Sequence, residues 1–139
     1  NEINTWEEAS AFVEEHGVLF SVAFGPSILE DGVINVPYHY PWGENYESYA
    51  RAVISQVGEL HYLFLAANRG DWSPMHFSTP EVAQIMLEHG CTMAYCLDGG
   101  QTAEVLFHGE LRNMPEFNAE RVVSDVICFA SGLPEGGAS

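Results

Sequence analysis

One stretch decides the expected fold: residues 78–100 read STPEVAQIMLEHGCTMAYCLDGG. It opens with a capping box, Ser78–Glu81, in which two side chains can bond each other's backbone at a helix start. Apolar residues then recur at helical spacing as far as Gly90, a residue typical of a helix end. The apolar run Cys91–Leu97 predicts a buried strand, and Asp98-Gly99-Gly100 predicts a turn directly after it.

The beginning of the chain carries the same signals in the same order. Thr5–Glu8 forms a second capping box, and Gly17 predicts the end of the helix that follows. The apolar, β-branched and aromatic run Val18–Phe24 predicts another buried strand, which Gly25-Pro26 ends.

The two halves of the chain can be aligned on each other. Glu15-His16-Gly17 matches Glu88-His89-Gly90 without a gap. Because the order of elements also agrees, an internal repeat is favoured over a chance likeness of two helix-glycine-strand units. We expect residues 5–57 to superpose on residues 78–127 about a pseudo-twofold axis, and small ligands commonly bind between such halves.

The remaining expected elements are hairpins, loops and strands. We predict hairpins at residues 27–36 and 104–112, an aromatic loop at 37–49, and strands at 52–56, 60–67 and 122–129. A tight turn at Gly58-Glu59 should join the first two of these strands into a further hairpin. The chain is therefore expected to form one domain, residues 1–139, of the α/β (α+β) class. Its core would be a mixed, mostly antiparallel sheet packed by two main helices.

Composition and charge limit the possible functions. The chain has 139 residues, of which 47% are hydrophobic, enough for the core of one domain. Its 20 acidic residues against 4 basic ones give a net charge of -16, which repels nucleic acid and anionic membranes, so we exclude both as partners. No apolar run is long enough to span a membrane, and the acidity suits a secreted or cell-surface protein. The three cysteines are expected to be free thiols, and the histidines lack metal-ligand spacing.

All the basic residues are arginines, and three of them stand at expected element ends: Arg51, Arg69 and Arg121. The planar guanidinium matches a phosphate or carboxylate in two-bond geometry. We expect these three to face one cleft near the Asp98-Gly99-Gly100 turn, with Arg112 outside it. The alternative for each arginine alone is an ion pair with a nearby acid.

The order of motifs is distinctive over most of the chain, from Thr5 to Phe129. Ala94–Gly100, a short hairpin and Glu120–Asp125 are similar to the pattern N-L-D-G-G-G-S-S, hairpin, E-R-P-V-S-N. Earlier segments are similar to F-G-P, R-T-A-I-G and D-G-R: Phe24-Gly25-Pro26, Arg51–Ile54 and Asn68-Arg69-Gly70. Together they resemble the phosphodiester glycosidase family, which includes the enzyme that uncovers mannose 6-phosphate by removing N-acetylglucosamine.

The resemblance implies hydrolysis of a sugar-1-phosphodiester. The residues it implies as catalytic are Asp98, Arg51 and Arg121, with Asp98 as acid, base or metal ligand. Those it implies as binding phosphate or substrate are Arg69, Gly99, Gly100, Thr102, Ser124 and Asn68. Tyr38, Tyr40, Trp42 and Tyr46 can stack on a sugar or simply pack in their loop. No cofactor is required, and a divalent metal remains possible.

This sequence also departs from the family pattern. Gln101-Thr102 replace glycine and serine, and Asn68 replaces aspartate. The family's early N-G-G-F-F segment has no counterpart, so we expect this chain alone to be inactive or nearly so. Its phosphorylated-glycan site would then be completed by upstream residues, by self-association or by a partner chain. The alternatives are a non-catalytic binding module for phosphorylated or acidic glycan, or a purely structural domain.

Overall fold

The structure is a computed structural model that describes residues 3–41, 45–67, 77–115, 117 and 119–130. It contains two α-helices, a five-stranded sheet and a small two-stranded sheet, which confirms the expected fold class. The elements are α1 (Trp6–His16), β1 (Ser27–Glu30), β2 (Val33–Ile34), β3 (Arg51–Gly58), β4 (His61–Ala67), α2 (Thr79–Glu88), β5 (Met93–Leu97), the 3-10 turn η1 (Gly100–Thr102), β6 (Leu106–Phe107) and β7 (Glu110–Leu111). Neither α-helix of this described part is long and apolar enough to cross a membrane.

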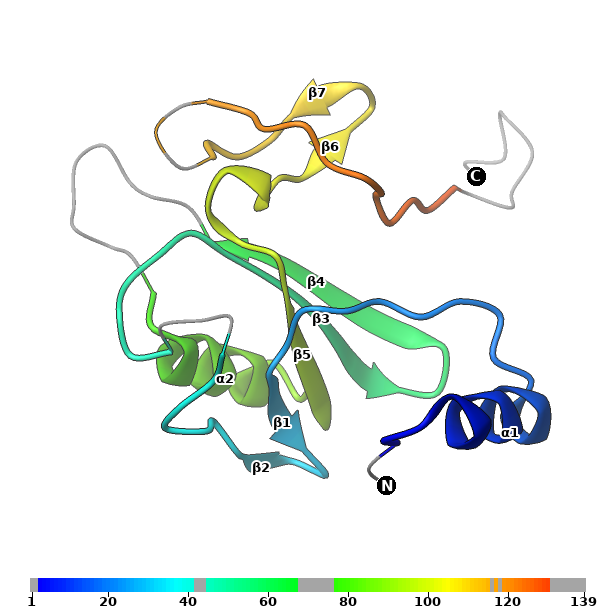
Figure 1. Cartoon of the computed structure of the whole chain (residues 1–139). Coiled ribbons are helices and arrows are strands. Elements are labelled where there is room, and N and C mark those ends of the chain that lie inside the picture. The colour runs from blue at the N-terminus through cyan, green and yellow to red at the C-terminus, as the bar shows by residue number, and fades with distance from the viewer. Residues whose placement is uncertain (1–2, 42–44, 68–76, 116, 118, 131–139) are drawn as a thin grey trace, which may run out of the picture.

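The main sheet is antiparallel throughout, in the order β2-β1-β5-β3-β4 (Figure 1). Strands β3 and β4 form the predicted hairpin, in which Arg51 pairs with Ala67. Strand β5 is inserted between β1 and β3 and brings Leu97 opposite Ala52. This register places the end of β5 beside the beginning of β3, although the two are far apart in the sequence.

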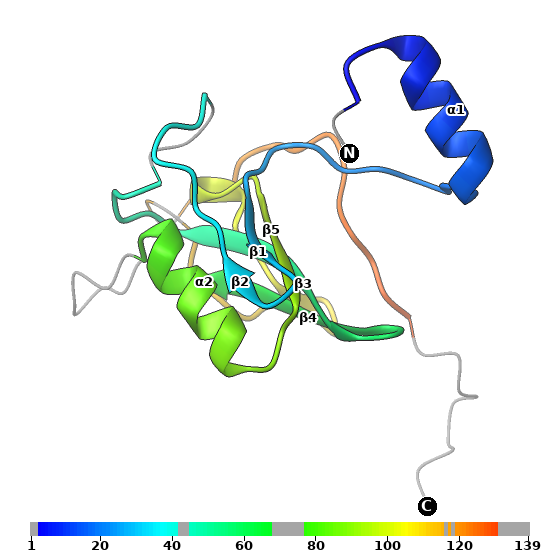
Figure 2. The same cartoon turned by 90° about the horizontal axis from the view of Figure 1, so that it is seen from below.

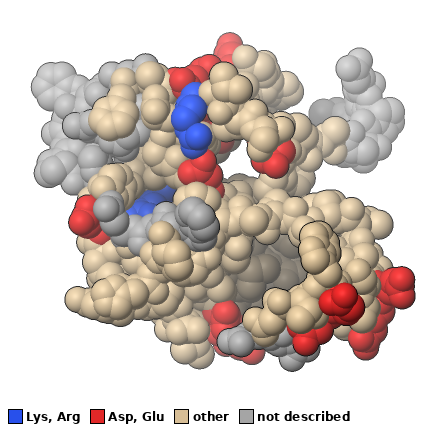
Figure 3. Space-filling model, in the orientation of Figure 1, with Lys and Arg blue, Asp and Glu red and all other residues tan. Residues whose placement is uncertain are grey.

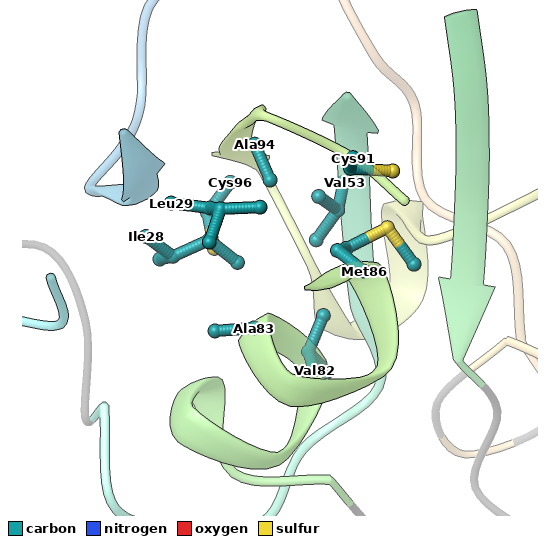
Figure 4. Packing of buried hydrophobic residues seen from close by; sticks show 9 residues of the cluster. All are labelled: Ile28, Leu29, Val53, Val82, Ala83, Met86, Cys91, Ala94 and Cys96. Atoms are coloured by element: carbon teal, nitrogen blue, oxygen red, sulfur yellow. The ribbon is translucent and has the colours of Figure 1, made fainter. Parts of the chain in front are cut away.

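Helix α2 covers one face of this sheet, and its capping box forms as predicted. The Ser78 backbone N–H donates to the Glu81 carboxylate over 2.8 Å, and the helix ends just before Gly90, whose φ is +79°. Figure 4 shows the buried cluster between helix and sheet: Ile28, Leu29, Val53, Val82, Ala83, Met86, Cys91, Ala94 and Cys96. Such burial of aliphatic side chains is the main stabilising contribution to the fold.

Helix α1 also begins and ends as predicted, but it does not join the core. The Glu8 N–H donates to the Thr5 hydroxyl over 3.2 Å, and Gly17 ends the helix in the left-handed region. None of its residues is buried. Figures 1 and 2 both show α1 away from α2, joined to β1 by an extended segment.

That segment corrects the prediction of a strand at Val18–Phe24. These residues belong to no strand, and Leu19 and Phe20 are 92% and 78% exposed. A strand needs a neighbour to pair its backbone N–H and C=O groups. Within the described sheet, β2 and β4 are the edges, and neither pairs with this segment.

The prediction of a last strand at Val122–Phe129 is also wrong, because this segment has no neighbouring strand to pair with. The segment runs without ladder pairing, and Val122 is 94% exposed. It touches the sheet through Phe129, whose ring centroid lies 4.6 Å from that of Phe64 on β4. An apolar run indicates that side chains favour burial, but it does not provide the strand that must lie alongside.

These two corrections bear on the internal repeat. The first half has a helix, an unpaired segment, a hairpin and a strand, whereas the second has a helix, a strand, a hairpin and an unpaired segment. The identical element order expected for residues 5–57 and 78–127 is therefore absent from the structure. The duplication of the sequence itself remains a prediction.

Candidate functional site

The turn after β5 is held against the beginning of β3. The Gly100 N–H donates to the Ala50 carbonyl over 2.8 Å. A Cβ placed on Gly99 would lie only 2.6 Å from the same carbonyl oxygen, so the close approach of these two segments requires glycine. Asp98 thereby follows the end of β5 that lies beside the beginning of β3, where Arg51 stands.

A cleft of about 540 Å³ opens between this turn and the loop before β3. Its described lining residues are Phe24, Gly25, Tyr40, Pro41, Asn45, Tyr49, Ala50, Arg51, Cys96, Leu97, Asp98, Gly99 and Gly100. The cleft thus combines a cation, a carboxylate and aromatic rings, which is a common composition for a site that binds a polar small molecule. On the face drawn in Figure 3, basic surface is confined to two small areas, and acidic groups lie beside the upper one.

Arg51 holds the loop that forms one wall of the cleft. Its Nε donates to the Phe77 carbonyl over 3.2 Å, and one terminal nitrogen donates to the Glu47 carbonyl over 2.8 Å. The guanidinium carbon lies 5.4 Å from the centre of the Tyr49 ring. These contacts with backbone carbonyls and an aromatic ring orient the guanidinium at the cleft.

Asp98 contacts a second predicted arginine. Arg121 donates to the Asp98 carboxylate over 2.5 Å, and the two side chains are 51% and 46% exposed. Residue 121 reaches Asp98 because the Gln101 side-chain amide donates to the Ala119 carbonyl over 3.1 Å. Arg112 pairs instead with Glu110 on the β6–β7 hairpin, at 2.9 Å. Of the predicted arginines that the structure describes, Arg51 lines the cleft, whereas Arg121 contacts Asp98 without lining it.

The glycine turn supplies fewer free donors than predicted. The Gly100 amide donates to the Ala50 carbonyl, and its expected role in binding an anion stays a prediction. The Thr102 hydroxyl donates to the Gly99 carbonyl over 2.9 Å and stabilises the turn itself. A short turn packed against a strand uses its own polar groups to satisfy its backbone.

The other predicted site residues lie elsewhere. Ser124 is exposed in the unpaired segment and is absent from the described lining of the cleft. Asn68, Arg69 and Trp42 lie outside the described residues. Among the residues that the structure does describe, no group of three or more His, Cys, Asp or Glu side chains is placed to hold a metal ion.

The part of the cleft that Tyr40 lines was only partly predicted. The Tyr40 hydroxyl donates to the Phe24 carbonyl over 2.6 Å, and a Cβ on Gly25 would overlap that hydroxyl. Burial raises the pKa of Tyr40, and the neighbouring Tyr95 and Cys96 add to this effect. Tyr40 is therefore packed into the wall of the cleft instead of standing free to stack on a ligand.

Asn45 lines the cleft, and the sequence did not indicate it. It is 3% exposed, and its side-chain amide donates to the Pro37 carbonyl over 2.8 Å. The Asn45 backbone carbonyl accepts a hydrogen bond from the Thr79 N–H at the beginning of α2, also over 2.8 Å. Asn45 thus holds the aromatic loop against the beginning of α2. In the sequence, a lone asparagine among aromatic residues is typical of an ordinary turn and gave no sign of this role.

Two further ionisable groups have shifted pKa values, and one of them, Cys96, lines the cleft. Burial raises the pKa of the Cys96 thiol to about 11, opposed in part by the positive charge of Arg51. Burial also raises the pKa of Glu104, and the Glu120 carboxylate adds to the shift. One Glu104 oxygen is buried without a hydrogen-bond partner among the described residues.

Comparison with known proteins identifies the family of the chain. A search of curated proteins finds no significant match. A family model, described as phosphodiester glycosidase, matches residues 4–130 and therefore includes both walls of the cleft. The match spans nearly the whole chain, and the chain belongs to the phosphodiester glycosidase family.

Proposed function

We propose that the cleft binds a sugar-1-phosphodiester and hydrolyses the bond that joins the sugar to the phosphate. The observation that carries the proposal is the meeting of Arg51 with the Asp98-Gly99-Gly100 turn in one cleft, in a member of this family. Water would add at the sugar, releasing free sugar and leaving the phosphate on the partner alcohol. Family membership supports the reaction class, and the identity of the sugar belongs to the proposal.

Arg51 is proposed to bind the phosphate. The chain carries a net charge of -16, so an anionic substrate needs a local cation to approach. Arg51 is already oriented by two backbone carbonyls, so little reorganisation is needed when an anion arrives. Its charge would also stabilise the negative charge that develops on the phosphate as the bond breaks.

Asp98 is proposed to transfer a proton as the bond between sugar and phosphate breaks, or to bind the sugar hydroxyl groups. Its carboxylate lines the cleft and is also held by Arg121. The pairing fixes its orientation, as a catalytic carboxylate requires. Arg121 would then bind the substrate phosphate directly, or would position Asp98 from outside the cleft.

A non-catalytic binding module for phosphorylated or acidic glycan is the second candidate. The observation that favours it is the number of polar groups already in use: Gly100 bonds Ala50, Thr102 bonds Gly99, and Asp98 pairs with Arg121. A site whose groups are so engaged can still bind a ligand through its remaining surface. We propose a secreted or cell-surface setting for either function, because such glycans occur there.

The test compares two exposed arginine–acid pairs. Asp98→Asn removes the carboxylate of the Asp98–Arg121 pair, and Glu110→Gln removes that of the Glu110–Arg112 pair outside the cleft. Release of N-acetylglucosamine from its 1-phosphodiester with a simple alcohol is measured for each protein, supplied with an upstream family segment that contains N-G-G-F-F. The proposal expects Asp98→Asn to lose about 100-fold or more in kcat, as is usual for a general acid or base, and Glu110→Gln to match the wild type. Equal rates for both variants would reject Asp98 as a catalytic residue.

A further inference from the structure

Two exposed tyrosines pack against each other beside the cleft. The ring centroids of Tyr38 and Tyr46 are 5.5 Å apart, with 46° between the ring planes. Tyr38 is 75% exposed and Tyr46 is 54% exposed. Single exposed aromatic residues are common on proteins, but two rings held together in solvent form an ordered apolar surface. These two residues are called the tyrosine pair below.

The tyrosine pair is fixed to the scaffold by the residues that precede each ring. Pro37 precedes Tyr38, Asn45 precedes Tyr46, and the Asn45 side chain joins the two by donating to the Pro37 carbonyl over 2.8 Å. Asn45 is in turn bonded to the first turn of α2 through Thr79. The buried amide therefore holds both rings in place, and a ligand that stacks on them loses little further entropy in ordering the protein.

The tyrosine pair also borders the proposed substrate site. Asn45 lines the cleft and is adjacent in sequence to Tyr46, while Tyr40 lines it two residues after Tyr38. Tyr40 is committed to the wall through its bond to Phe24. The exposed rings are thus placed outside the wall, where a ligand that extends from the cleft would pass.

The chemistry of this surface favours a neutral sugar ring. A tyrosine combines an apolar ring face with a hydroxyl, which suits the C–H face and hydroxyl groups of a pyranose. The pair has no positive charge, and Glu47 follows Tyr46 directly in the sequence. An anionic group would be repelled here, whereas it is attracted by Arg51 inside the cleft.

We propose that the tyrosine pair is an outer subsite that stacks on a neutral pyranose ring of a glycan whose phosphate-linked sugar occupies the cleft. The inference rests on the proposed function, because it takes the phosphate to lie near Arg51. It adds that the protein acts on, or binds, a glycan that is longer than the phosphate-linked sugar alone.

The test uses three neutral probes: maltotriose, cellotriose and N-acetylchitotriose. Binding of each is measured by NMR titration for the wild type, Tyr38→Ala and Tyr46→Ala. Tyr62→Ala is the matched control, because Tyr62 on β4 is 46% exposed but does not line the cleft. At least one probe should bind the wild type, and each change in the pair should weaken that binding about 2- to 10-fold, the usual contribution of an aromatic contact. Tyr38→Phe, which keeps the ring, should retain most of the wild-type affinity for the probe, and Tyr62→Ala should leave that affinity unchanged.

Absence of binding by all three probes would overturn the subsite, and so would an equal loss in Tyr62→Ala. Hydrolysis of an N-acetylglucosamine 1-phosphodiester with a methanol leaving group separates the two proposals, because this substrate carries no second sugar to stack on the pair. It is measured on the chain supplied with an upstream family segment that contains N-G-G-F-F. Probe binding that depends on the pair, without hydrolysis, would support the subsite and reject the proposed reaction. Hydrolysis with no effect of the pair on probe binding would reject the subsite alone.

Discussion

Replacing Gly99 by alanine should separate the Asp98 turn from strand β3. The added Cβ would meet the Ala50 carbonyl oxygen at 2.6 Å, whereas real Cβ contacts are longer. That oxygen also accepts the Gly100 N–H over 2.8 Å, so neither group can retreat without losing this hydrogen bond. The φ of Gly99 is -110°, which alanine adopts easily, so the effect comes from packing and not from backbone strain.

The expected cost follows from these contacts. Overpacking against a backbone atom costs about 1–3 kcal/mol, and the hydrogen bond contributes about 1 kcal/mol. The loss of chain entropy in the unfolded state offsets roughly 0.4–1 kcal/mol of this. The net destabilisation is therefore about 1–3.6 kcal/mol, which lowers the midpoint of urea unfolding by on the order of 1 M.

Urea unfolding of Gly99→Ala is compared with that of Gly58→Ala. A Cβ on Gly58 meets no atom within 4 Å, and its φ is not positive, so this control should be unchanged or slightly more stable. If both variants unfold at the wild-type midpoint, the close approach of the turn to Ala50 is not a feature of the folded protein. The reasoning about the position of Asp98 would then be refuted.

Three further predictions test other parts of the account. Glu104→Gln should stabilise the protein at pH 7 and not at pH 3, because the pKa of the Glu104 carboxyl is raised and the folded state loses stability as pH rises through that pKa. Urea unfolding midpoints at the two pH values would show this difference, and an effect that does not depend on pH would contradict it. Ser78→Ala, at the N-cap of α2, should lower the free energy of unfolding by about 1 kcal/mol. Thr5→Ala should affect only amide exchange within α1, because that helix buries no residue. Equal losses in the free energy of unfolding would show that α1 is part of the core. At pH 8, iodoacetamide should modify exposed Cys128 long before Cys96, because burial raises the pKa of the Cys96 thiol to about 11. Mass spectrometry that showed the reverse order would be inconsistent with a buried Cys96.

Local signals predicted the elements that frame the site. The capping box at Ser78, the helix end at Gly90 and the apolar run into Asp98 each depend on neighbouring residues, and all three appear in the structure. The β3–β4 hairpin was predicted equally well, because its two strands are joined by a tight turn. Family motifs then placed Arg51 and Asp98 in one site, and the register of β5 against β3 brings them together.

The failures concern partners that lie far away in the sequence. Val18–Phe24 and Val122–Phe129 have the composition of strands, but no local pattern states which edge they would pair with. The Gly100 amide was expected to be available because glycines permit close approach, yet Ala50 is the group that approaches. Asn45 has no local signal at all, since its role depends on Pro37 and Thr79 being folded around it.

The central claim is that Asp98, held in this cleft, carries out sugar-1-phosphodiester hydrolysis. The most direct measurement is N-acetylglucosamine release by this chain alone and by the same chain supplied with an upstream family segment containing N-G-G-F-F, each with and without Asp98→Asn. The account predicts little turnover by the chain alone, clear turnover when the segment is supplied, and a loss of about 100-fold or more in Asp98→Asn. Turnover that is unaffected by Asp98→Asn, or no turnover in the supplemented wild type, would contradict it.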